Sequence, residues 1–97
     1  MTKHEQYFQE MIDRNKDVFD TFRTIHNNYL INPDAWQDKL NTVGMEIMDI
    51  IKEYEDRLCS HSEGSKFGKF STGLSDKFWS LIRRDFPKID FVGVKRS

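Results

Sequence analysis

Two stretches of helically spaced apolar residues, separated by one Asn-Pro-Asp sequence, constrain how this chain can fold. In residues 8–29 the apolar side chains recur at alternating steps of three and four, with Asn15 at the one polar position. Residues 36–58 repeat the pattern. Pro33 would interrupt a continuous helix, but it suits the first turn of a new one, where Asn32 can cap the free N–H groups. The pattern therefore predicts one helix over about 3–31 and another over about 33–58.

Each of these two helices would leave a broad apolar stripe in water unless the stripes faced each other. Because the turn between them is very short, the second helix must fold back along the first. Gly44 lies beside the second stripe, where it would let a neighbouring helix approach closely. A third helix is predicted over about 74–86, closed by Pro87. Four apolar residues in the tail of residues 87–97 predict that it docks as an extended piece or a short strand.

The predicted fold class is therefore all-α: an antiparallel helical hairpin of two long helices, with a short third helix and a docked apolar C-terminal tail. The chain has 97 residues, a length that corresponds to one domain spanning residues 1–97. Asn15 allows two interpretations. A polar residue inside an apolar stripe often fixes register or oligomeric state, whereas one at the edge of the stripe simply bonds to water.

The cysteine content and the N-terminal residues bear on where the protein works. Cys59 is the one cysteine, so no intramolecular disulfide can form, which fits a reducing compartment. No apolar run approaches the roughly 18 residues that a membrane span needs. Residues 1–6 open into a charged amphipathic pattern without the apolar stretch of a signal peptide. We therefore expect a cytoplasmic protein with no membrane partner.

Catalytic and cofactor motifs are all incomplete. Cys59 and His61 could form half a zinc site, but no second cysteine or neighbouring histidine completes it. The His-x-Glu sequence at 61–63 lacks the Pro-Cys-x-x-Cys half of the deaminase signature. The loop from Gly64 to Gly68 departs from the Walker spacing, and no Glu-x-x-His sequence indicates a di-iron bundle. We therefore expect no enzymatic activity, no cofactor and no metal.

Charge is distributed unevenly along the chain. Residues 1–60 contain 7 Lys+Arg and 12 Asp+Glu, a net charge of −5, whereas residues 61–97 contain 8 and 4, a net charge of +4. In the loop predicted over 59–73, cations alternate with aromatic rings, as in proteins that bind single-stranded nucleic acid. The residues of this hypothesis are Lys66, Phe67, Lys69, Phe70, Arg83 and Arg84. In the alternative, favoured by an overall charge near zero, the phenylalanines pack onto the core and the lysines stay in water.

Without a complete catalytic, cofactor or metal motif, we interpret the function of the chain as protein binding. Two long helices and a short one do not cover all of the aromatic-rich apolar surface. We expect the remaining apolar surface to bind a second copy of the chain or a partner protein. Because tryptophan and tyrosine dominate interface hot spots, the aromatic candidates for partner binding are Tyr7, Phe8, Trp36, Trp79 and Phe91. We predict a small non-enzymatic interaction module (a regulator, inhibitor or complex subunit) whose partner is another protein or a second copy in a homodimer. The alternative is a nucleic-acid-associated protein that uses region 61–97.

Overall fold

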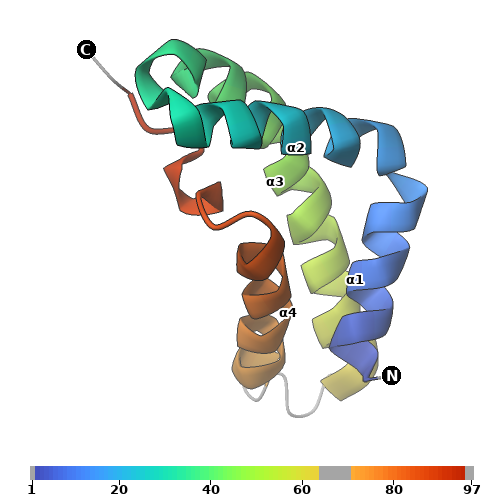
Figure 1. Cartoon of the computed structure of the whole chain (residues 1–97). Helices are drawn as coiled ribbons and strands as arrows, with labels where there is room; N and C mark the ends of the chain where they lie inside the picture. Colours follow the sequence, from blue (N-terminus) through green and yellow to red (C-terminus); the bar gives the residue numbers. More distant parts are fainter. Residues whose placement is uncertain (1, 64–70, 96–97) are drawn as a thin grey trace.

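The computed structural model describes residues 2–63 and 71–95, and among these it leaves out the side chains of residues 61–63 and 71–72. The described residues form four α-helices and no strand, so the all-α class is confirmed. The helices are α1 (Lys3–Arg14), α2 (Lys16–Ile31), α3 (Pro33–Glu63) and α4 (Ser71–Asp85), followed by a 3₁₀ helix, Ile89–Phe91 (Figure 1). Within the described ranges, none of the helices combines the length and apolarity needed to cross a bilayer.

A capping box starts α1 at Thr2. The side-chain oxygen of Thr2 accepts a hydrogen bond from the N–H of Glu5, and the Glu5 carboxylate accepts one from the N–H of Thr2 at 2.9 Å. The hydrogen bonds from the Thr2 backbone and hydroxyl lower the pKa of Glu5. The ionised carboxylate therefore stands at the positive end of the helix dipole and stabilises this terminus.

The predicted continuous helix over 3–31 is wrong, because the chain turns at Asn15. Asn15 has φ −126° and ψ 35°, outside the helical region. Its side-chain amide donates to the carbonyl oxygen of Met11 at 2.9 Å, which satisfies one of the carbonyls left without a partner at the end of α1. As a result α1 and α2 meet at a steep angle (Figure 1). The role of Asn15 in the structure is to end one helix and to begin the next.

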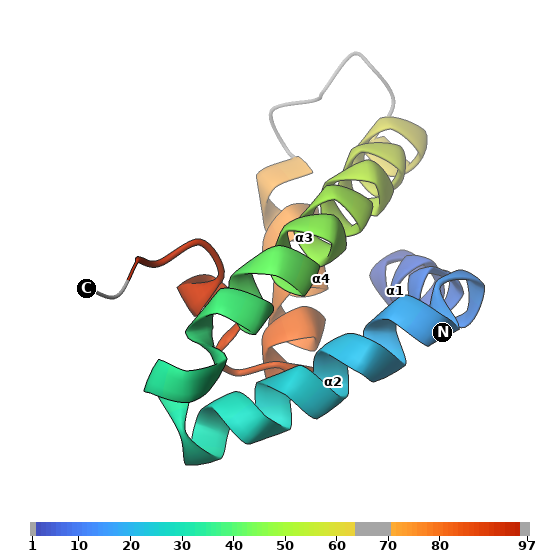
Figure 2. The same cartoon turned by 90° about the horizontal axis from the view of Figure 1, so that it is seen from above.

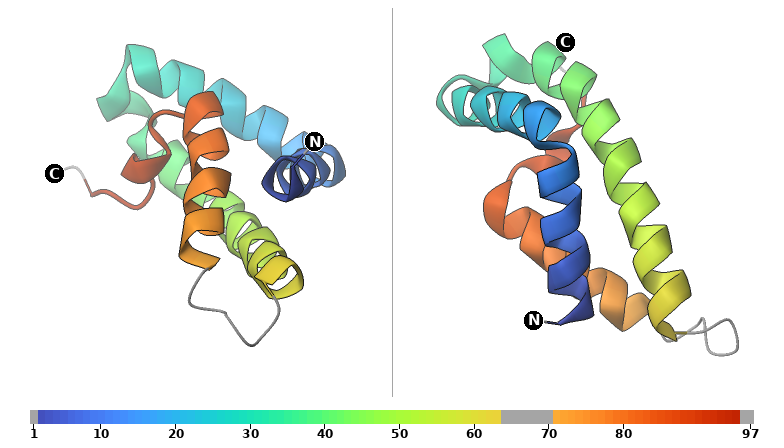
Figure 3. Two further views of the ribbon diagram at one scale, coloured as in Figure 1. Left: turned by 90° about the horizontal axis from the view of Figure 1, so that it is seen from below. Right: turned by 90° about the vertical axis from the view of Figure 1, so that its right-hand side faces the viewer.

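The other helices pack around α3. α2 lies beside the first part of α3 near the turn at Asn32, and the two helices diverge from there (Figure 2). α1, α4 and the second part of α3 pack against one another, with α3 running in the opposite direction to the other two (Figure 3). The hairpin of two long helices is not confirmed, since its first arm is two helices that contact different parts of α3.

The core lies where the apolar stripes of all four helices meet. Phe22 from the first predicted stripe and Ile47 from the second are both fully buried. Phe86, just after α4, packs against the ring of Phe22 at a centroid distance of 5.1 Å, which connects α4 to α2. The buried apolar residues are Phe8, Met11, Phe19, Phe22, Ile25, Tyr29, Leu40, Ile47, Ile51, Tyr54, Leu58, Phe78, Ile82, Phe86 and Ile89.

Both α3 and α4 extend into the segment predicted as a loop over 59–73. α3 continues past Leu58 to Glu63, and α4 begins at Ser71 instead of residue 74. The sequence prediction ended at Leu58 because apolar spacing ends there, whereas a helix can continue through polar residues that need no burial. The rest of the predicted loop, residues 64–70, lies outside the described residues.

Candidate interaction surface

The C-terminal tail, which is described through Lys95, leaves α4 after Phe86 and lies beside the first part of α3 (Figure 2). Pro87 cannot continue the helix, and the chain turns so that the N–H of Ile89 donates to the carbonyl oxygen of Phe86 at 3.0 Å. Ile89 is buried in the core. The tail therefore docks through a 3₁₀ helix, and the prediction of an extended piece or short strand is wrong for this part.

A buried histidine holds the start of the tail. His26 of α2 is almost fully buried, and its Nε2 accepts a hydrogen bond from the backbone N–H of Lys88 at 3.0 Å. Burial lowers the pKa of His26, and the positive charges of Arg23 and Lys88 lower it further, against a hydrogen bond with Asn27 that raises it. The imidazole is therefore neutral at neutral pH, which is the state in which a ring nitrogen can accept this bond.

Two amide side chains on α3 bind the backbone of the tail. The Nε2 of Gln37 donates to the carbonyl oxygen of Phe91 at 2.9 Å. One turn further along α3, the Oδ1 of Asn41 accepts from the N–H of Gly93 at 2.7 Å, and its Nδ2 donates to the carbonyl oxygen of Val94 at 2.8 Å. These backbone groups of the tail are therefore satisfied by side chains of α3.

The two amides are themselves held in position. Gln37 Nε2 also donates to Asn41 Oδ1 at 2.8 Å, and the hydroxyl of Tyr29 on α2 donates to Gln37 Oε1 at 3.0 Å. Gln37 is almost completely buried, so its bond with Tyr29 forms away from bulk water. The network fixes both amides in the orientation that matches the tail.

Gly44, one further turn along α3, leaves space for a side chain of the tail. A Cβ atom built on Gly44 would lie 2.6 Å from Cγ2 and 2.7 Å from Cγ1 of Val92, far inside van der Waals contact. The predicted close approach at Gly44 thus occurs, but the approaching segment is the tail and not a helix. Gln37, Asn41 and Gly44 form what we call the tail groove.

Large apolar side chains are exposed on the last turn of α2 and on the tail, and these two segments lie toward the same end of the molecule (Figures 1 and 2). Ile31 is 83% exposed, Leu30 48%, and Phe91 and Val94 39% each. The ring of Phe91 lies 6.4 Å from that of Tyr29 on the last turn of α2, which places the tail beside the end of that helix. We call these four residues the apolar end.

The predicted partner-binding aromatics lie in different environments. Phe8 is 7% exposed and belongs to the core, whereas Tyr7, Trp36 and Trp79 are half-buried against it. The indole N–H of Trp79 donates to a carboxylate oxygen of Glu55 at 2.9 Å. Only Phe91 of the five belongs to the apolar end. Leu30, Ile31 and Val94 could not be predicted from helical spacing, because such spacing identifies residues that can be buried and not those that the fold leaves uncovered.

The residues of the nucleic-acid hypothesis are described in part. Lys66, Phe67, Lys69 and Phe70 lie outside the described residues. Arg83 donates from Nε and Nη2 to the carboxylate of Asp90 at 3.1 and 3.2 Å, and this bonding raises the pKa of Arg83. Arg84 Nε lies 3.6 Å from Asp85 Oδ1. Both arginines therefore have acidic neighbours, which reduces the positive field that they offer to phosphates.

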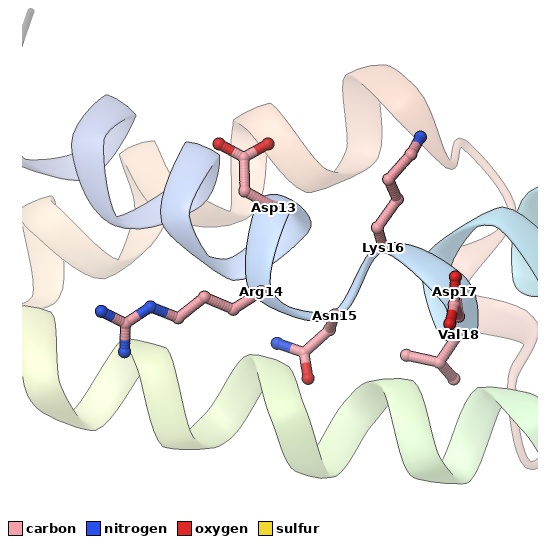
Figure 4. A pocket seen from close by; sticks show the side chains of 6 residues that line it. All are labelled: Asp13, Arg14, Asn15, Lys16, Asp17 and Val18. Carbon is pink, nitrogen blue, oxygen red and sulfur yellow. The ribbon is translucent and has the colours of Figure 1, made fainter.

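Two open hollows lie elsewhere on the surface. The larger, of about 370 Å³, is lined by the consecutive residues 13–18 at the bend between α1 and α2 (Figure 4). Its lining includes two acidic and two basic side chains; Arg14 pairs with Glu10 and Lys16 with Asp20 on their own helices. The smaller, of about 110 Å³, lies between α1 and α4. Neither hollow brings together groups that would select a ligand.

The part of the chain that is described also provides no geometry for a metal-binding or nucleophilic site. There, no three His, Cys, Asp or Glu side chains gather in an arrangement that could hold a metal ion. Cys59 is half-buried on α3, and the side chain of His61 lies outside the description. Comparison with known proteins adds no assignment: no family model, curated protein or solved structure matches the chain. Function is therefore argued from the surface alone.

Proposed function

We propose that this protein is a small non-enzymatic interaction module that binds a partner protein through the apolar end. The observation that carries the proposal is the exposure of four large apolar side chains at one end of the molecule, Ile31 above all. Apolar surface contributes about 25 cal/mol per Å² when it is removed from water. A partner that covers these side chains would gain this energy, whereas a monomer leaves them in water.

The surroundings of the apolar end support the proposal. Asn32 and Asp34 at the turn and Lys95 on the tail are exposed polar residues beside it. Protein interfaces commonly have this composition, with an apolar and aromatic centre inside a polar rim. The tail groove and His26 hold the tail against α2 and α3, so Phe91 and Val94 are presented on an ordered backbone. A preorganised surface loses less conformational entropy on binding. The proposed location is the cytoplasm, supported by the single cysteine.

The test compares full-length baits in affinity capture from the native host. Ile31→Lys places a charge in the apolar end, and Thr21→Lys places the same charge at an exposed position earlier on α2. We expect one or more proteins to be retained by the wild type and by Thr21→Lys, and to be reduced at least about tenfold with Ile31→Lys. Size-exclusion chromatography with light scattering reports self-association of the same three proteins.

Two results together would contradict the proposal: a wild type that remains strictly monomeric, and a set of captured proteins that Ile31→Lys leaves unchanged. Because Ile31 is 83% exposed, its substitution leaves the core intact, and unfolding does not explain a loss of binding. Far-UV circular dichroism of the three baits checks this point.

A further inference from the structure

We propose that the tail groove also accepts the tail of a second copy of this chain, so that two molecules exchange residues 89–94 and form a dimer. This inference rests on the proposed interaction function and names a partner for it. In such a dimer the apolar end of each unit combines Leu30 and Ile31 of one copy with Phe91 and Val94 of the other.

α3 recognises the tail mainly through hydrogen bonds to the tail backbone. Gln37 and Asn41 form hydrogen bonds with three backbone groups of the tail, and Gly44 adds space for Val92. All these recognition groups stand on consecutive turns of one helix. Amide side chains that bind a peptide backbone in this way recognise a segment whether or not it belongs to the same chain.

The segment shown to fit this groove is residues 89–94 of this chain, with Ile89 in the core, Val92 against Gly44 and Gly93 at φ +92°. A positive φ favours glycine over other residues, so the position of Gly93 also selects for this sequence. A second copy supplies the same segment with every one of these features, which makes it the partner that the groove fits.

The connection between α4 and the tail is short. Two residues, Pro87 and Lys88, separate the buried Phe86 from the buried Ile89. Exchange of an identical segment between two copies is a low-cost route to a dimer, and a short hinge favours it. The exposed pair between Arg83 and Asp90 also holds the tail to its own α4, but exposed ion pairs contribute little to stability.

The experiment tests whether a groove in one full-length chain accepts the tail of another. Gly44→Leu fills the groove and leaves the tail intact, whereas Val92→Asp disables the tail and leaves the groove intact. When the two variants are mixed, the tail of the first can dock in the groove of the second. We expect native mass spectrometry to show the mixed dimer at least about tenfold above either homodimer.

A peptide gives an independent measurement. A fluorescein-labelled peptide of residues 87–95 is titrated with the full-length wild type, Val92→Asp and Gly44→Leu. We expect binding at least about tenfold tighter to Val92→Asp than to the wild type, whose own tail competes, and loss of binding to Gly44→Leu. If circular dichroism finds a variant unfolded, Val92→Ala and Asn41→Ala replace the two substitutions in both experiments.

The outcomes separate the two proposals. Tail exchange would be overturned if no mixed dimer forms and if the peptide binds the wild type and Val92→Asp equally or binds neither of them. If proteins are still captured in an Ile31-dependent way, the proposed interaction function stands and its partner is a different protein. A Gly44→Leu homodimer that forms as strongly as the mixed dimer would also overturn the inference, because two copies of this variant offer no open groove.

Discussion

The contact between Gly44 and Val92 predicts an unusual response to adding a single methyl group. Replacing glycine by alanine inside a helix normally stabilises a protein by about 1 kcal/mol, because alanine has the higher helix propensity. At Gly44 the new Cβ would lie 2.6 Å from Cγ2 of Val92, so the tail must move. Overpacking of this kind costs about 1–3 kcal/mol. We therefore expect Gly44→Ala to lower the free energy of unfolding by about 0–2 kcal/mol.

The sign of the effect should reverse when Val92 is shortened. Val92→Ala removes both methyl groups that the new Cβ would meet, and it costs about 1 kcal/mol by itself because Val92 is only half-buried. In that background Gly44→Ala should recover the ordinary gain of about 1 kcal/mol. The two substitutions should therefore show a coupling energy of about 1–3 kcal/mol in a double-mutant cycle.

Urea unfolding followed by far-UV circular dichroism measures the four free energies of the cycle. Gly73→Ala is the matched control, because a Cβ added at this exposed residue of α4 meets nothing within 4 Å. The control should be neutral or stabilising by up to about 1 kcal/mol. The packing argument is refuted if Gly44→Ala stabilises the protein as Gly73→Ala does, or if its effect is the same with valine and with alanine at position 92.

Three other perturbations follow from single contacts. Because burial holds the pKa of His26 below its ordinary value of 6.5, the unfolded chain takes up the proton first. The free energy of unfolding should thus fall as pH decreases through this value and level off below the folded-state pKa. Urea titrations at a series of pH values should show this dependence. His26→Gln should remove the part of the pH dependence that His26 contributes. Glu55→Ala removes the acceptor of the Trp79 indole N–H and should cost about 1–3 kcal/mol in thermal or urea unfolding, whereas the exposed Glu53→Ala should cost less than about 0.5 kcal/mol. Asn15→Ala should cost about 1 kcal/mol in the same assay, because a carbonyl at the end of α1 loses its hydrogen bond; no change would contradict the role of this residue at the bend.

Local patterns predicted much of the secondary structure. The stripes over 8–29 and 36–58 are helical apart from the turn at Asn15, and the break between them at Asn32 lies where Pro33 predicted it. α4 ends before Pro87 as expected. The bend at Asn15 was missed because the apolar spacing continues through it. A helix and two helices joined by one residue have nearly the same pattern, and the pattern does not show that α1 packs against both α3 and α4.

The candidate site was much less predictable. The sequence gives no sign that Gln37 and Asn41 bind the tail, because polar residues four apart on a helix are usually exposed to water. Their partners, Phe91, Gly93 and Val94, lie more than fifty positions further along the chain. Which apolar residues remain exposed also depends on how the apolar stripes of the helices pack against one another.

The sequence by itself determined the helical class, the break at Pro33 and the residues able to enter a core, since these follow from local backbone preferences and from apolar periodicity. Only the tertiary structure decided the bend between α1 and α2, the binding of the tail by α3 and the position of the apolar end. The physical reason is that hydrogen bonds and close packing between distant residues depend on relative position in space, which local spacing does not encode.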